Sequence, residues 1–150
     1  MKTLVTYDSV YGNTEIVARA IAAALPGEVE VQRVGQVQTS ALETLGLLVI
    51  GSPTHGAMPT EAAQALVDRI GPPPREGARV ATFDTRLTWP FLERWGGFAA
   101  PKMAEALEGK GWTVAGEPGG FFVRGLKKGP LKKGEVERAS SWAKALVGNG

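Results

Sequence analysis

The distribution of apolar and polar residues along the chain predicts five strand regions. Residues 45–52, LGLLVIGS, form a continuous apolar run, and residues 2–8, KTLVTYD, are apolar or β-branched at both even and odd positions. Strands of this kind are covered on both faces, as in the centre of a parallel sheet. The other regions are 28–34, which alternates as an edge strand does, 78–84, and a fifth region made of two short pieces, 112–116 and 120–125.

Four segments between these strands carry apolar residues at helical spacing. Pro26 and Gly27 end the first of them, and Thr60 is a suitable N-cap for the second. Strands that alternate with helices predict right-handed crossovers and a parallel sheet with helices on both faces. The fold class we expect is therefore α/β, doubly wound, with a five-stranded parallel sheet. The predicted helices are 13–25, 60–70, 100–111 and 134–148.

Composition limits what this fold contains. The chain has 150 residues, 43% of them hydrophobic, and no shift in composition, so we expect one domain over residues 1–150. It has no Cys, which excludes disulfides, thiolate metal sites and a Cys nucleophile. We find no charged leader and no apolar window long enough to span a membrane, and we expect a soluble cytoplasmic protein. A net charge of +2 allows an acidic partner without requiring nucleic acid.

Three loops follow the carboxyl ends of the predicted strands, at 8–14, 52–59 and 84–99. In doubly wound sheets, ligands bind beyond these strand ends, where the winding direction reverses. The sole His of the chain lies in the second loop, and the third loop is long and aromatic. These three loops therefore form the candidate ligand site.

The first loop is suited to a phosphate group although it contains no Lys or Arg. The start of a helix at Asn13 offers unsatisfied N–H groups and the positive end of the helix dipole. Ser9 and Thr14 add hydroxyl donors, and Gly12 allows the backbone to pass close to a ligand. A Walker A loop would need Gly-Lys-[Ser/Thr], and the dinucleotide fingerprint would need more glycines, so a phosphate monoester fits best. The alternative is an ordinary helix cap and turn.

These residues resemble the flavodoxin family. Ser9-x-Tyr11-Gly12-Asn13-Thr14 is similar to the flavodoxin pattern [ST]-x-T-G-x-T with Tyr in its third place. The sequence GSPTHG at 51–56 resembles the second flavin-contacting loop, and FDTRLTWP at 83–90 lies where the third belongs. The resemblance covers essentially the whole chain. It implies strand order 2-1-3-4-5 and non-covalent FMN at the strand ends.

The resemblance also implies cofactor-binding residues in each loop. Those implied for the FMN phosphate are Ser9, Val10 through its backbone, Tyr11, Gly12, Asn13 and Thr14. Those implied for one side of the isoalloxazine ring and its N5 edge are Pro53, Thr54, His55 and Gly56. Those implied for the pyrimidine end are Asp84, Thr85 and Arg86. Here the third loop departs from the family pattern, and Trp89, or else Phe91 or Trp95, would cover the ring.

Some residues of these loops carry further hypotheses. A Gly56 peptide can reverse cheaply and present a carbonyl to flavin N5, and a cationic Arg86 near the ring would favour the reduced, anionic flavin. His55 could equally be a loop residue without a role, and a lone His makes a transition-metal site improbable. Asp8 and Asp84 suggest a receiver domain, but that reading needs an acceptor Asp where this chain has Gly51 and Ser52.

Two functions remain open from the sequence. The chain could be an FMN-binding electron carrier between redox partners, with no substrate of its own. It could instead be an FMN-dependent NAD(P)H:quinone-type oxidoreductase, with the aromatic third loop forming a substrate pocket. A basic run is either solvated surface or a docking patch for an acidic redox partner, and no nucleic-acid motif accompanies it. The run consists of Arg124, Lys127, Lys128, Lys132 and Lys133. Oligomeric state is not readable from the sequence.

Overall fold

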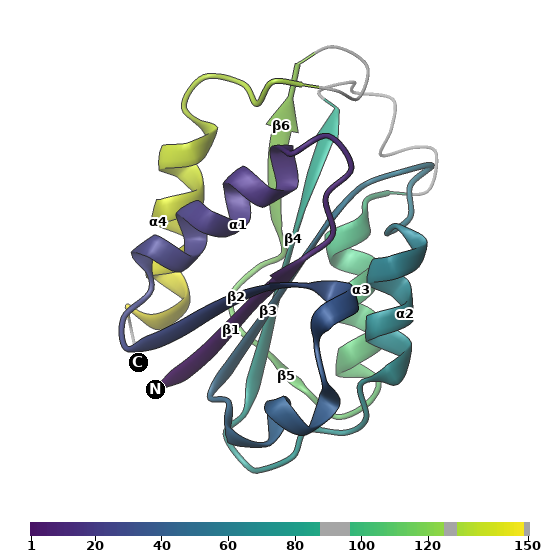
Figure 1. Ribbon diagram of the computed structural model, residues 1–150, viewed down its shortest axis with the longest axis vertical. Helices are drawn as coiled ribbons and strands as arrows, with labels where there is room; N and C mark the ends of the chain where they lie inside the picture. Colours follow the sequence, from purple (N-terminus) through teal and green to yellow (C-terminus); the bar gives the residue numbers. More distant parts are fainter. Residues whose placement is uncertain (88–96, 125–128, 149–150) are drawn as a thin grey trace.

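The computed structural model describes residues 1–87, 97–124 and 129–148, and these form one parallel sheet with helices on both faces (Figure 1). The sheet has the order β2-β1-β3-β4-β5, and a further strand, β6, pairs with β4. The strands are β1 (Lys2–Tyr7), β2 (Glu28–Arg33), β3 (Leu47–Pro53), β4 (Arg79–Leu87), β5 (Thr113–Val114) and β6 (Gly119–Val123). The helices are α1 (Asn13–Ala24), α2 (Glu61–Arg69), α3 (Ala99–Glu108) and α4 (Glu135–Val147), with short 3-10 turns at Val34–Gln36 and Thr39–Thr44. The predicted α/β fold and its strand order 2-1-3-4-5 are confirmed.

The fifth position of the sheet is divided between two short strands. β5 pairs with Arg79 and Val80 at the beginning of β4, whereas β6 pairs with Phe83–Leu87 at its end. Between them the chain leaves the sheet at Gly116, which has a positive φ of 62°, and at Pro118, which has no N–H to donate. The two short pieces expected from the sequence therefore occupy one edge.

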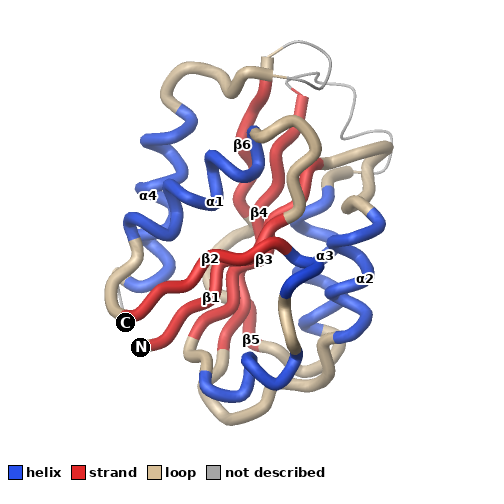
Figure 2. The backbone as a smooth tube through the Cα atoms, in the orientation of Figure 1, coloured by secondary structure: helices blue, strands red, loops and turns tan. Residues whose placement is uncertain are grey.

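Each face of the sheet carries its own hydrophobic core. Along β3, Leu48 and Ile50 pack under α2 and α3, while Leu47 and Val49 pack under α1 and α4. This alternation follows from the two-residue period of a strand, and it explains why the sequence of β3 is apolar at every position. Figure 2 shows the helices in two layers, with α1 and α4 on one side and α2 and α3 on the other.

Strand β4 is longer than the sequence pattern indicates. We expected it to end at Asp84, but it continues to Leu87, so Asp84, Thr85 and Arg86 belong to the strand rather than to the loop after it. The pairs Ser52↔Asp84 and Pro53↔Thr85 with β3, and the pairing with β6, hold the backbone extended. Backbone pairing on both sides outweighs the polar character of these side chains.

Glu135, the first residue of α4, joins this helix to strand β6. Its carboxylate accepts from the N–H of Phe122 at 2.7 Å and from Arg138 at 2.9 and 2.7 Å, and the residue is only 7% exposed. Burial acts to raise the pKa of Glu135, but Arg138 and the Phe122 N–H outweigh it and hold the pKa below its ordinary value. The charged carboxylate therefore stabilises the fold.

We expect Glu135→Gln to lower the free energy of unfolding near neutral pH by about 1–3 kcal/mol. Because the pKa is lowered on folding, this stabilisation is present above the ordinary carboxyl value of about 4.3 and is lost as the pH falls below it. In urea unfolding, the difference in the free energy of unfolding between wild type and Glu135→Gln should become smaller as the pH falls through this range. Glu137→Gln, an exposed change on the same helix, is the control. A pH-independent difference between Glu135→Gln and wild type would contradict the prediction.

Candidate functional site

The loop after β1 forms the beginning of helix α1. Gly12 is the N-cap residue and has a φ of 93°, a conformation that suits glycine. The Ser9 hydroxyl oxygen accepts from the N–H of Gly12 at 3.1 Å and from that of Glu15 at 3.4 Å. A hydroxyl that accepts twice still has its own proton to donate. Ser9 is therefore both a cap of this helix and an available donor for an anion placed at its start.

The next two residues, Asn13 and Thr14, lie inside the fold. The Asn13 side chain lies against Gly129, where any larger residue would collide with it. The Thr14 hydroxyl is 2.8 Å from the Thr85 hydroxyl, and the pair is fully buried. Thr85 lies near the end of β4. The bond therefore joins the loop after β1 to the end of β4. Val10 and Tyr11, in contrast, are about half exposed.

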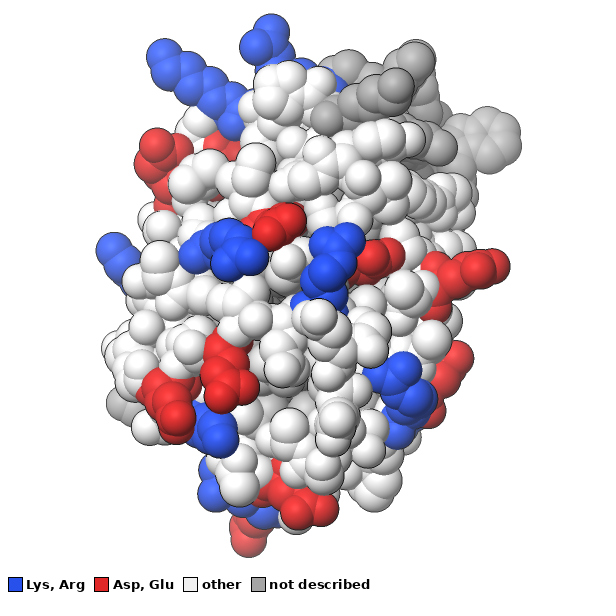
Figure 3. Space-filling view, in the orientation of Figure 1, with Lys and Arg blue, Asp and Glu red and all other residues white. Residues whose placement is uncertain are grey.

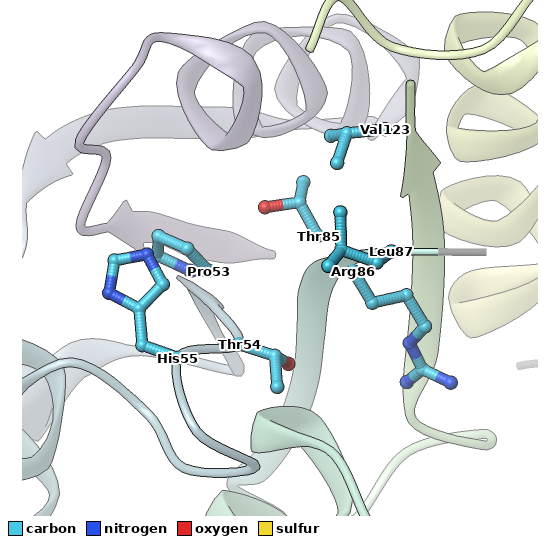
Figure 4. A pocket seen from close by; sticks show the side chains of 7 residues that line it. All are labelled: Pro53, Thr54, His55, Thr85, Arg86, Leu87 and Val123. Carbon is cyan, nitrogen blue, oxygen red and sulfur yellow. The ribbon is translucent and has the colours of Figure 1, made fainter. Parts of the chain in front are cut away.

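A small, open pocket lies beside this hydroxyl pair. In Figure 4, Val123, Thr85 and Leu87 lie together, with Pro53 and His55 across from them. The ends of β3, β4 and β6 all contribute to it. Its lining residues are Pro53, Thr54, His55, Thr85, Arg86, Leu87 and Val123. The structure thus brings together five of the residues that the sequence indicated and adds Leu87 and Val123.

Arg86 contributes to the pocket, but its charged group points elsewhere. The guanidinium donates to both oxygens of Asp84, at 2.7 and 2.9 Å, and lies 3.6 Å from the ring centre of Phe98. It also packs directly against Gly120, where a Cβ atom would collide with it. Figure 4 shows the Arg86 side chain extending away from the pocket. Because Asp84 neutralises the charge, the geometry gives no support to a direct effect of Arg86 on the flavin potential.

Asp84 is fully buried and does not line the pocket. It accepts from the N–H of Ala100 at 2.8 Å, while the Thr54 hydroxyl accepts from the N–H of Ala99 at 3.0 Å. Burial raises the pKa of Asp84, and Arg86, the Ala100 N–H and the Thr54 hydroxyl oppose this rise. These two side chains cap helix α3 and fix it against the end of β4.

The loop after β3 closes in a two-residue turn. The backbone groups of His55 and Met58 bond to each other in both directions, at 2.9 and 3.0 Å. Both central residues have a positive φ, 56° for Gly56 and 68° for Ala57, as in a type I′ turn. Lys102 of α3 donates to the carbonyl of Ala57 at 2.7 Å and holds the turn to the helix. The strain at Ala57 would be relieved if the peptide between Gly56 and Ala57 reversed to a type II′ turn.

Three aromatic residues that the sequence offered for ring stacking, Trp89, Phe91 and Trp95, lie outside the described residues. Lys127 and Lys128 of the basic run do so as well. Their roles stay predictions. No helix in the described ranges combines the length and apolar character needed to cross a bilayer.

Comparison with known proteins decides the family. Residues 4–86, more than half of the chain, match the family model of the flavodoxin domain. The chain belongs to the flavodoxin family. Members of this family bind FMN and carry electrons to redox partners, and this chain is accordingly an FMN-binding electron-transfer protein.

The similar proteins include a flavodoxin that this chain covers in full and longer flavoproteins of which it covers about a third. The chain is similar to flavodoxin 2 from Bacillus cereus, with 24% identity, a TM-score of 0.79 and full coverage of both chains. It is also similar to rubredoxin oxygen:oxidoreductase from Desulfovibrio gigas, with 19% identity and a TM-score of 0.77, over 99% of this chain and 35% of that one. "Putative diflavin flavoprotein A 2" of Thermosynechococcus vestitus is 32% identical over 173 residues, 97% of this chain. The chain spans only 28% of that curated relative.

The flavodoxin site in this chain has a donor set that suits FMN. A dianionic phosphate needs donors at a helix start, and the Ser9 hydroxyl and the first turn of α1 supply them. A flat ring with polar edges needs apolar walls and a few polar groups, and Pro53, Leu87 and Val123 lie beside hydroxyls in the pocket. The Thr14–Thr85 bond places the start of α1 next to the pocket.

Proposed function

We propose that FMN binds in this chain with its phosphate at the 8–14 loop and its ring in the pocket between 53–55 and 85–87. The observation that carries this assignment is the hydroxyl pair of Thr14 and Thr85, because it connects the helix start with the pocket. The contacts proposed for Val10, Tyr11, Gly12 and Asn13 follow from their place in the same loop. Asp84 holds the site in shape and does not touch the cofactor.

In the proposed mechanism, bound FMN supplies the one-electron chemistry, and the protein binds and orients it. Ser9 and the first turn of α1 donate to the phosphate, and the dipole of this helix stabilises its charge without a Lys in the loop. Pro53, Leu87 and Val123 exclude water from the ring. Gly56 and Ala57 provide a turn whose central peptide can point its carbonyl in either direction, with Lys102 holding the turn in place.

The direct test is the absorption spectrum of the purified protein, followed by release and identification of the chromophore. We expect flavin bands and FMN at a stoichiometry near one per chain. A protein that stays colourless after incubation with excess FMN would overturn the proposal. Mixing the oxidised protein with NAD(P)H then separates a carrier, which stays yellow, from the reductase that the sequence left open, which bleaches.

We also propose that the basic residues beside β6 dock an acidic redox partner in the cytoplasm. Val123 and Leu131 form an antiparallel bridge, the N–H of Arg124 donates to the carbonyl of Pro130, and the N–H of Lys132 donates to the carbonyl of Phe122, so Arg124 and Lys132 lie on paired segments of the chain. Arg124, Lys132 and Lys133 are exposed, and Val123 at the base of this patch lines the pocket. In Figure 3, basic side chains project at this end of the molecule. Fractionation of cells would check the compartment.

Removing these charges should slow oxidation of the reduced protein by an anionic oxidant. We expect Arg124→Gln/Lys132→Gln/Lys133→Gln to lower the rate with ferricyanide by about three- to tenfold at low salt, and salt to remove the difference. With hexaammineruthenium(III), a cation, the same variant should react no more slowly than wild type. Lys2→Gln/Arg75→Gln/Lys144→Gln, which removes three charges at the start of β1, in the loop before β4 and on α4, is the matched control. Equal rates in the two triple variants would contradict the docking patch.

A second candidate is that the chain acts as the flavin domain of an oxygen-reducing flavoprotein. The observations that favour it are the 32% identity to the diflavin flavoprotein and the likeness to rubredoxin oxygen:oxidoreductase, proteins of which the chain covers 28% and 35%. The mass of the protein in its natural cell distinguishes the cases. A band near the 15.8 kDa of this chain favours the free carrier, and a much larger one favours the domain.

A further inference from the structure

Arg33 extends from strand β2 to the phosphate loop. It is the last residue of β2 and pairs in register with Tyr7, the last residue of β1. Its guanidinium donates to the carbonyl of Ser9 at 3.0 Å, and its Cζ atom lies 5.4 Å from the ring centre of Tyr7. Ser9 is 24 positions away in the sequence. The fold thus places a cation beside a loop whose own sequence contains none.

Within the part of the chain that the structure describes, Arg33 has no ion-paired carboxylate of its own, although Glu15 lies close enough that, after Arg19, the Arg33 guanidinium helps to lower its pKa. The Glu15 carboxylate is occupied by Arg19 at 2.9 Å, and Asp8 accepts from the N–H of Ser9 at 3.0 Å. Within the described ranges, the ion pairs join Arg19, Arg86 and Arg138 to carboxylates, and Arg33 takes part in none of them. Its positive charge therefore stands beside a helix start already suited to a phosphate.

We propose that Arg33 is the positioning residue of the phosphate site, which both orients Ser9 and attracts the dianion. This inference rests on the proposed FMN site. By donating to the Ser9 carbonyl, Arg33 fixes the residue whose hydroxyl faces the start of α1. Its charge then favours the phosphorylated flavin over the uncharged flavin that lacks the phosphate. Arg33 accounts for how a loop without Lys discriminates between FMN and riboflavin.

The test is a fluorescence titration of the protein, freed of flavin, with FMN and with riboflavin. We expect Arg33→Gln to weaken FMN binding by about five- to tenfold at about 20 mM salt, and raising the salt to about 300 mM to remove most of this loss. Riboflavin binding should stay within about twofold of wild type, since riboflavin carries no phosphate. Arg33→Lys should restore most of the FMN affinity, because it keeps the charge.

Arg75→Gln, which removes one exposed charge in the loop before β4, is the control and should leave both affinities unchanged. If Arg33→Gln weakens FMN and riboflavin equally, Arg33 has only a structural role and the proposal is wrong. Unchanged FMN affinity in Arg33→Gln also overturns the proposal for Arg33. If the wild-type protein binds FMN in the same titration, the proposed FMN site is still supported. A wild-type protein that binds neither flavin would overturn both.

Discussion

Asp84→Ala is expected to lower the free energy of unfolding by about 3–5 kcal/mol, the largest effect we predict for a single change. The variant leaves the guanidinium of Arg86 without its carboxylate, although that side chain is only 14% exposed. It also removes the acceptor of the Ala100 N–H at the start of α3. A buried cation and a buried donor would then both lack a partner, and each is costly.

Urea unfolding followed by circular dichroism measures this loss, and two further variants separate its causes. Asp84→Asn keeps an oxygen for Ala100 and should be less damaging than Asp84→Ala. Asp84→Ala/Arg86→Met removes the unpaired charge together with its partner and should recover part of the stability. If the double variant is no more stable than Asp84→Ala, the unpaired guanidinium is not the cause.

The fold was predictable because its signals are local. The apolar run of β3, the amphipathic pattern of α1 and the cap at Thr60 each depend on a few neighbouring residues, and the cap is realised as a bond from the Ala63 N–H to the Thr60 hydroxyl. The end of β4 was not predictable from this pattern. Asp84, Thr85 and Arg86 are polar, and only pairing with β3 and β6 makes them a strand.

The residues of the site also fall into those that local sequence signals identify and those that only the fold brings in. The first turn of α1 and the residues after β3 could be identified because helix starts and strand ends have sequence signals. Arg33, Leu87, Val123 and Lys102 carry no such signal, since pairing and packing bring them to the loops from distant parts of the chain. The pairing of Arg86 with Asp84 has a simple cause: residues two apart on a strand share one face. Once 84–86 is known to be a strand, that ion pair is expected.

Ser9→Ala is expected to weaken FMN binding by about 10- to 150-fold, the range that corresponds to about 1.5–3 kcal/mol for a hydrogen bond to a charged group. The Ser9 hydroxyl accepts from the N–H groups of Gly12 and Glu15, so its own proton is free to be donated to the phosphate. Alanine removes both roles. Titration of the flavin-free protein with FMN measures the loss.

Two controls assign this loss to the phosphate contact. Ser9→Thr keeps the hydroxyl and should retain most of the FMN affinity, whereas riboflavin, which has no phosphate, should bind Ser9→Ala nearly as well as it binds wild type. The lost cap on α1 costs about 0.5–2 kcal/mol of stability, so the titration belongs well below the melting temperature. If riboflavin affinity falls as far as FMN affinity, Ser9 acts by shaping the helix start. The phosphate would then be held without a hydrogen bond from the Ser9 hydroxyl.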